Sequence, residues 1–470
     1  MLKDLPRTVK DITQKYLYEE KKIWTILDSG KRISGTLGIR DNGLGLDFTL
    51  KREQVDSVKG KRIQRVTAKG NEHSRALLLN SSAWESPLTG FFKHGDANMR
   101  LNPSLLLVQE SSKAINEKIP YIQGYLPGIA EWFDRDFLEF DNDEYKFKEN
   151  KTIYHEMELG TSAKITLNAK LTIDFDSQIL ESKFIAYPES FVRIDFAEPT
   201  QVNGALNIFS HIENFFNFIF STPHSTHIFT SSNLKKGNRN LPLYILSPYR
   251  RKEYEREEKR KHSNMLFSWE DVSNRDKVFV RWVLEYKRIE EIVDTLVLLK
   301  STAVSEEMRF TTIINSLEAV HRRYFNSKRQ SDDDYQTRLD GILSLISDED
   351  DKKLVGSRLE YGNEISLRSR LKEVCSIGEK YGITKPSKTT INKILETRNY
   401  YTHGDESKKG NILDYMGLYT TNSLLGKYLK VLLLQIIGVK EDELKAIVGK
   451  SPQFQYNYRD EPPKDNKYFF

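Results

Sequence analysis

The sequence has very little cysteine, since Cys375 is the only one among 470 residues. One thiol cannot form an intrachain disulfide or a multi-cysteine zinc site, and this scarcity is typical of a reducing cytosol. Because Cys375 follows Leu371 and Val374 at helical spacing, we interpret it as a small residue in a helical core.

Long hydrophobic runs are also missing. The longest one, residues 431–439, is interrupted by Gln435 and Gly438 and is too short to span a bilayer. The first seven residues carry charges and lack the apolar core of a signal peptide. We therefore expect a cytoplasmic protein with no membrane segment.

Neither sign of charge dominates, because the chain has 72 lysines and arginines and 67 aspartates and glutamates. The net charge of +5 permits nucleic-acid binding without requiring it, so any basic surface has to be local. The content of 38% hydrophobic and 30% charged residues indicates a soluble globular protein. Its length suits about three domains.

Hydrophobic residues recur at every second position in the first part of the chain, which is typical of strands with one solvent-exposed face. The clearest case is 165–176, and other candidates are 23–27, 32–39, 46–50, 63–68, 77–79, 105–108 and 192–196. We predict a β-rich domain over residues 1–200, arranged as a sandwich or as a pair of small sheets. Trp84 and Trp132 interrupt this region, and we interpret both as core anchors.

Residues 201–262 are predicted to connect two halves. They contain a phenylalanine-rich helix at 202–220, extended pieces at 226–230 and 243–246, and a linker of mixed charge at 250–261. His224 and His227 are three residues apart, but no nearby acid or further histidine completes a metal site. We expect no metal and no other cofactor.

After residue 263 the period becomes helical. The pattern predicts helices at 277–300, 308–325, 335–346, 365–381, 388–402 and 412–437. Helices joined by short loops form a bundle, so we expect an all-helical domain over residues 263–449 and a tail over 450–470. The predicted fold class is α+β, a sandwich-like β-rich domain followed by a helical bundle.

The end of the helix at 388–402 is the strongest candidate site. Arg398, Asn399 and His403 stand within six residues, and Gly404 has the position of a left-handed C-cap. Such a pattern is common by chance, and its place among apolar helices gives it weight. On an ideal helix Arg398 and His403 lie roughly 140° apart, a gap that the long arginine stem can close.

Arg398 also continues the apolar stripe of Ile391 and Ile394, so it is expected to face a packing surface. A guanidinium there needs a carboxylate, a subunit boundary or a phosphate. On the helix at 308–325, His321 lies on the apolar stripe and Glu318 at its edge. Either they are an ordinary core histidine and a flanking acid, or Glu318 holds Arg398 or His403 in place.

Several of these segments resemble a known family. Residues 306–310, 317–323 and 398–404 resemble the Apea-like HEPN domain. The segment 35–37, the Trp132 segment and the helix containing Phe215 and Phe216 resemble the N-terminal domain paired with it in the ApeA family of bacterial anti-phage defence proteins.

The resemblance implies a metal-independent RNA endonuclease that acts as a toxin in abortive infection. Its catalytic residues are implied to be Arg398, Asn399 and His403. HEPN domains commonly pair, so a homodimer is expected, with RNA as substrate and a phage-derived trigger acting through the β-rich half. Transfer RNA is a candidate substrate by analogy with other nuclease toxins.

The chemistry agrees with this resemblance. RNA supplies its own nucleophile, the 2′-hydroxyl, so cleavage needs a base and a cation. Imidazole changes protonation near neutral pH, and a guanidinium offers a fork to phosphate oxygens. Tyr400 and Tyr401 could stack bases, and Lys408 and Lys409 could bind phosphates, although packing and solvation explain them as well.

A second hypothesis is a non-catalytic module. In it the helical domain only dimerises or binds RNA or a nucleotide, under regulation by the β-rich domain. Arg398 would then make a structural ion pair with Glu318.

Overall fold

The computed structural model describes residues 23–28, 31–40, 43–70, 74–85, 96–133, 138–141, 144–147, 152–176, 183–221, 224–247, 265–299, 304–325, 328–404 and 406–457. The chain divides into two compact units. Unit 1 comprises residues 1–213 and 224–260, and unit 2 comprises 214–223 and 261–470. The mixed-charge linker predicted at 250–261 lies outside the described residues.

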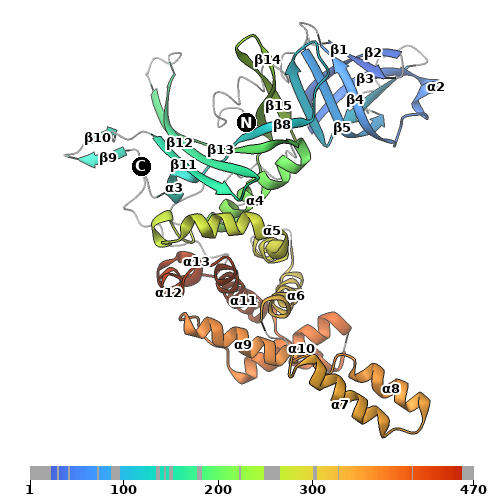
Figure 1. The fold of residues 1–470 in the computed structure, drawn as a ribbon, viewed down its shortest axis with the longest axis vertical. Coiled ribbons are helices and arrows are strands. Elements are labelled where there is room, and N and C mark those ends of the chain that lie inside the picture. The colour runs from blue at the N-terminus through green and yellow to red at the C-terminus, as the bar shows by residue number, and fades with distance from the viewer. Residues whose placement is uncertain are drawn as a thin grey trace. The chain divides into compact units, whose positions relative to one another are not determined.

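Unit 1 is built on β-strands (Figure 1). Thirteen of the described strands form one sheet in the order β11-β12-β13-β8-β14-β15-β7-β5-β4-β1-β2-β3-β6, and every pairing is antiparallel. The strands are β1 (Ile23–Asp28), β2 (Lys31–Arg40), β3 (Gly43–Lys51), β4 (Arg62–Lys69), β5 (Ser74–Glu85), β6 (Asp96–Asn102), β7 (Leu105–Glu110), β8 (Lys118–Tyr125), β11 (Thr152–Leu159), β12 (Ala163–Asp176), β13 (Lys183–Gln201), β14 (Ile228–Lys236) and β15 (Arg239–Leu246). A separate hairpin joins β9 (Leu138–Asp141) and β10 (Glu144–Phe147).

Six strands close on themselves, because β5 also pairs with β6. The closed ring runs β5-β4-β1-β2-β3-β6 and forms a small barrel (Figure 1). The β5 strand pairs with β7 through its first half and with β6 through its second half. Between the two halves, Asn80 adopts a left-handed conformation with φ of 49°.

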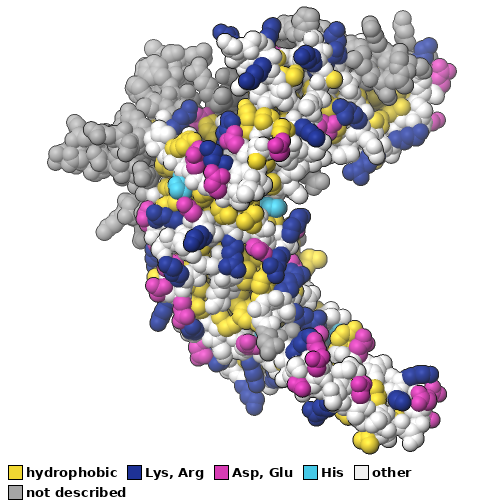
Figure 2. Space-filling view, viewed as in Figure 1, with side chains coloured by type: hydrophobic (Ala, Val, Ile, Leu, Met, Phe, Trp, Pro, Cys, Tyr) yellow, Lys and Arg dark blue, Asp and Glu magenta, His cyan; other side chains and the backbone are white. Residues whose placement is uncertain are grey.

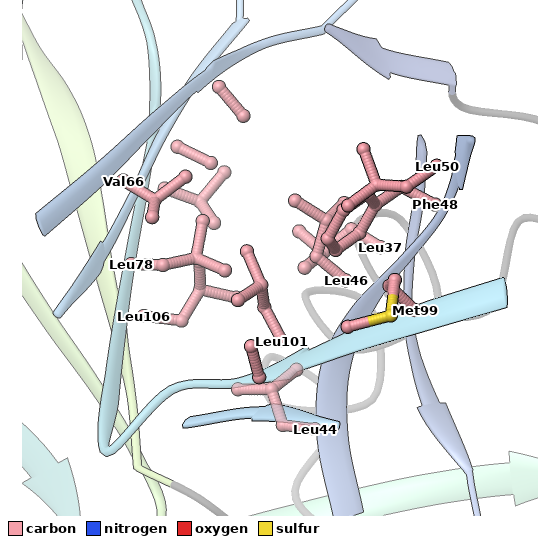
Figure 3. Packing of buried hydrophobic residues seen from close by; sticks show 14 of the residues in the cluster. Leu37, Leu44, Leu46, Phe48, Leu50, Val66, Leu78, Met99, Leu101 and Leu106 are labelled. Carbon is pink, nitrogen blue, oxygen red and sulfur yellow. The ribbon is translucent and has the colours of Figure 1, made fainter. Parts of the chain in front are cut away.

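The barrel encloses a hydrophobic core, part of which comes from β6, a strand that was not predicted. Side chains from its strands pack together with others from neighbouring β7. Figure 3 labels ten of this cluster: Leu37, Leu44, Leu46, Phe48, Leu50, Val66, Leu78, Met99, Leu101 and Leu106. Closure leaves no unpaired edge in this part of the sheet. The predicted β-rich domain is confirmed, but its strands form one continuous sheet with a closed end where a sandwich or a pair of small sheets was expected.

The two tryptophans of unit 1 have different environments. Trp132 in the short helix α3 (Ile129–Trp132) is buried, as predicted. The prediction for Trp84 was wrong, because its side chain on β5 is 56% exposed. Neighbouring Ala83 is fully buried, and since successive strand residues face opposite sides, Trp84 points out of the barrel.

Unit 2 is helical (Figure 1), which together with unit 1 confirms the α+β class. The last part of α4 (Val202–Phe220) belongs to it. The other α-helices are α5 (Arg275–Leu298), α6 (Glu306–Tyr324), α7 (Asp332–Ser344), α8 (Glu349–Leu359), α9 (Leu367–Lys380), α10 (Lys388–His403), α11 (Tyr415–Ile436), α12 (Glu441–Lys450) and α13 (Pro452–Gln455). The helices α8, α12 and α13 were not predicted.

The core of unit 2 joins aromatic rings of α4 and α5. The Phe215 ring lies edge-on to Phe279 at 4.9 Å and to Trp282 at 5.4 Å. Further along, α9 packs against α11, where Gly378 faces the ring of Tyr428. Cys375 is buried in this region, as predicted.

Gly378→Ala is expected to destabilise unit 2. A Cβ atom at this position would overlap the ring of Tyr428, and overpacking a core costs about 1–3 kcal/mol. Urea unfolding followed by helical circular dichroism measures the loss. Gly449→Ala is the control, because its added Cβ meets nothing within 4 Å and should be neutral or slightly stabilising. Equal stability of the two variants would contradict this packing.

Candidate active site

The helix α10 begins and ends where its sequence dictates. The Ser387 hydroxyl caps the first turn by accepting a hydrogen bond from the Thr390 amide. At the other end, Gly404 adopts φ of 65° and its amide donates to the Tyr400 carbonyl. Glycine has no Cβ to oppose this left-handed geometry. The helix therefore stops directly after His403.

One face of α10 is fixed against the rest of unit 2. Ile391, Ile394 and Thr397 are buried. The Thr397 hydroxyl accepts a hydrogen bond of 2.9 Å from the amide of Leu413, a residue that follows the turn of 3₁₀-helix η5 (Glu406–Asn411). The side chain of Asn411 also donates to the Glu396 carboxylate. These contacts fix the end of α10 and the segment after it together.

Arg398, Asn399 and His403 form one cluster. Nη1 of Arg398 donates a hydrogen bond to Nε2 of His403, with 2.8 Å between the two nitrogens. The same Nη1 lies 3.3 Å from Oδ1 of Asn399. A guanidinium has no acceptor, so Nε2 of His403 must accept this hydrogen bond. His403 is exposed and Arg398 half-buried. The structure thus brings together all three residues of the predicted motif.

Glu318 on α6 lies beside this cluster. Its Oε2 is 3.9 Å from Nη2 of Arg398, the outer limit of an ion pair. Its Oε1 instead accepts a hydrogen bond of 3.1 Å from Arg322. Arg322 also pairs with Glu364 at 2.9 Å, and Glu364 pairs with the buried Arg370 at 2.9 Å. Glu318 is therefore shared, and more closely bound to Arg322.

His321 does not join the cluster. It is fully buried on α6, its Nε2 lies 2.9 Å from Oε2 of Glu373 on α9, and its ring stacks on Phe325. These contacts bind Nε2 and the ring face inside the helical domain, so the structure favours the core alternative for His321, although its buried Nδ1 has no hydrogen-bond partner among the described residues. Its carboxylate partner comes from a helix about fifty residues further along, which local spacing does not reveal.

The proposed RNA contacts surround the end of α10. Tyr400 and Tyr401 are half-buried, and their rings meet edge to face at 5.2 Å. Burial raises the pKa of Tyr401, with a smaller contribution from Glu307. Lys409 is exposed on η5. The side chain of Lys408 lies outside the described residues.

Sequence reasoning missed the residues that support the cluster. The Thr397 hydroxyl and the chain of ion pairs through Arg322, Glu364 and Arg370 were not predicted. Thr397 carried a signal, because it lies three residues after Ile394 on the buried face of the helix. The pair of Arg322 with Glu318 also carried a signal, because the two residues lie four apart on one helix. The pair of Arg322 with Glu364 carried none, since it joins separate segments.

Two general features of the described residues complete the description. They contain no group of three or more histidine, cysteine or acidic side chains placed to hold a metal ion. None of the described helices combines the length and the apolar character needed to cross a bilayer.

Comparison with known families gives the class of this protein. Residues 311–443 match the family model described as Apea-like HEPN, which covers α10 and the Arg398 cluster. The helical unit therefore contains a HEPN domain. Residues 19–282, more than half of the chain, match ApeA N-terminal domain 1. The chain belongs to the ApeA family, and it is a HEPN-containing anti-phage defence protein. No curated protein and no solved structure matches it significantly.

Thr397→Val is expected to destabilise the candidate site. Valine keeps the shape of threonine but leaves the Leu413 amide without its acceptor, and an unsatisfied buried donor costs about 1–3 kcal/mol. Urea unfolding measures the loss, and faster proteolysis of the segment 404–413 should accompany it. Thr402→Val, exposed on the same helix, is the matched control. If the two variants unfold alike, Thr397 does not hold this segment.

Proposed function

We propose that this protein is a metal-independent RNA endonuclease that acts as a toxin in abortive-infection defence against phage. The observation that carries the proposal is the contact of 2.8 Å between Arg398 and His403, with Asn399 beside them at an accessible helix end. A phosphate-binding cation, a proton acceptor and an orienting amide thus stand within reach of one phosphodiester.

The proposed reaction uses the 2′-hydroxyl of the RNA. His403 Nε2 takes the hydroxyl proton while the 2′-oxygen attacks phosphorus. Arg398 donates hydrogen bonds to the non-bridging oxygens, on which negative charge gathers. The bond from phosphorus to the 5′-oxygen breaks, and that oxygen receives a proton. The products are a 2′,3′-cyclic phosphate and a 5′-hydroxyl. DNA lacks the 2′-hydroxyl and is not cleaved.

The resting hydrogen bond explains how substrate would activate this site. While Arg398 donates to Nε2 of His403, the lone pair of the base is occupied. A phosphate competes well for the guanidinium, because charge-assisted bonds to an anion are stronger than a bond to neutral imidazole. Substrate binding therefore moves Arg398 to the phosphate and frees His403 to accept a proton.

The proton for the leaving oxygen requires a second group. In a homodimer paired through its HEPN domains, a second His403 would face the same cleft and could supply this proton. RNA is the proposed partner, with transfer RNA as one candidate. The β-rich unit 1 is proposed to regulate the toxin in response to a phage-derived trigger.

The competing hypothesis of a non-catalytic module requires a close ion pair between Arg398 and Glu318. Their atoms are 3.9 Å apart, whereas Arg322 lies 3.1 Å from the same carboxylate. Such a loose pair contributes little stability. This geometry argues against the structural ion pair that the module hypothesis gives to Arg398.

His403→Ala is expected to abolish RNA cleavage. Loss of a general base lowers rates by about a hundred- to ten-thousand-fold, and the exposed position of His403 should leave the fold intact. Purified protein is incubated with RNA in a chelator, and the ends of the products are sequenced. Lys393→Ala, on an exposed position of the same helix, should cleave like the parent.

Arg398→Ala is expected to lower cleavage about a hundred- to thousand-fold by removing the cation at the phosphate. Phage protection in cells should fall with both site variants and persist with Lys393→Ala. Protection by His403→Ala equal to that of the parent would rule out the nuclease. Cleavage that stops when the chelator is added would refute metal independence.

A further inference from the structure

The barrel of unit 1 carries a surface rich in positive charge. It is formed by the helix α2 (Arg52–Val55), the turn that follows it and the strand β4, and we call it the basic surface. The described side chains between residues 51 and 75 include only two carboxylates, those of Glu53 and Asp56. The same segment holds eight cations: Lys51, Arg52, Lys59, Lys61, Arg62, Arg65, Lys69 and Arg75.

About half of these cations have partners. Arg52 and Lys59 share the carboxylate of Glu85, at 2.5 and 2.8 Å, and Arg65 pairs with Glu117 at 2.6 Å. Arg75 donates to a backbone carbonyl. Four exposed cations form no ion pair within the described part of the chain: Lys51, Lys61, Arg62 and Lys69. The surface therefore keeps an excess of positive charge.

An exposed tryptophan stands among these cations. Arg62 on β4 is paired directly with Ser82 on β5, and Trp84 lies two residues further along β5. Diagonal neighbours across two strands are within reach of long and aromatic side chains. Hydrogen bonds of Gly60 and Lys61 with the backbone of Ala83 fix the basic turn beside Trp84. The residue after Trp84 is Glu85, and its carboxylate forms ion pairs with Arg52 and Lys59.

The cations also follow a line. Seven residues separate Arg62 from Lys69 along β4, which corresponds to about 23 Å of extended strand. At this distance solvent largely screens the two charges from each other, so each stays available to a separate phosphate. Figure 2 shows lysine and arginine side chains outnumbering acidic ones over the barrel strands of the visible face. Such a track suits an extended chain of phosphates.

We propose that the basic surface of the barrel, with Trp84 as a stacking platform, binds single-stranded nucleic acid. Phosphates bind the cations that form no ion pair, and an unpaired base stacks on the exposed indole of Trp84. The bases of a duplex are stacked on one another and cannot stack on Trp84, so a duplex would be bound only through its phosphates. An anionic membrane also attracts cations and tryptophan, but β4 and the short α2 offer no amphipathic helix to enter it.

This inference goes beyond the proposed nuclease and does not depend on it. The basic surface belongs to unit 1, whereas Arg398 and His403 belong to unit 2. A binding assay on protein that cannot cleave separates the two proposals. Failure of the nuclease chemistry would leave the binding result unchanged, and failure of binding at the barrel would leave cleavage to be judged separately.

The test uses the full chain carrying His403→Ala. A fluorescein-labelled uridine RNA of about 20 nucleotides, long enough for one such site, is titrated by anisotropy at several salt concentrations. Lys61→Gln with Arg62→Gln should reduce the slope of log K against log salt by about 1.4, because each lost contact to a single strand removes about 0.7. Trp84→Ala should weaken binding about tenfold.

The control exchanges two exposed lysines of unit 2, Lys277→Gln with Lys445→Gln, so that the net charge changes equally. It should bind like the parent. Thermal unfolding confirms that each variant is folded. No binding by the parent, or equal loss in the control and the barrel variants, would overturn the proposal. It would also fail if the barrel variants lost binding to phosphatidylserine vesicles while RNA binding stayed unchanged.

Discussion

The hydrogen bond from Arg398 to His403 is the interaction on which the functional account depends. Arginine can only donate, so the imidazole is held with its Nε2 lone pair directed at the guanidinium. The same bond brings the proposed phosphate-binding cation next to the proposed proton acceptor, and it occupies the imidazole lone pair. The end of α10 can serve as a catalytic site only if RNA breaks this bond.

The remainder of unit 2 makes such an exchange possible. Buried contacts at Ile391, Ile394 and Thr397 fix the backbone of α10, so that side chains can move while the helix does not. Glu318 is held by Arg322 and therefore approaches Arg398 without neutralising it. A closer carboxylate would stabilise the fold at the expense of phosphate binding. The contact of 3.9 Å between Arg398 and Glu318 is weak enough for the guanidinium to leave it and bind a phosphate.

Local signals predicted α10 and its C-terminal cap well, because the buried stripe and Gly404 act within one helix. They also predicted that the stem of Arg398 could reach His403. The closure of the barrel was not predictable in this way, since it depends on β3 pairing with β6 across the intervening β4 and β5. The partner of His321 was missed for the same reason, because Glu373 is distant in sequence. Trp84 was assigned to the core although strand alternation beside buried Ala83 places it outside the barrel.

The most direct measurement uses a DNA oligonucleotide that contains one ribonucleotide. If His403 removes a proton from the 2′-hydroxyl, the protein will cut only on the 3′ side of that ribose. It will leave a 2′,3′-cyclic phosphate and a 5′-hydroxyl, with or without a chelator. Cutting of the all-deoxy oligonucleotide, or a 5′-phosphate at the new end, would contradict the account.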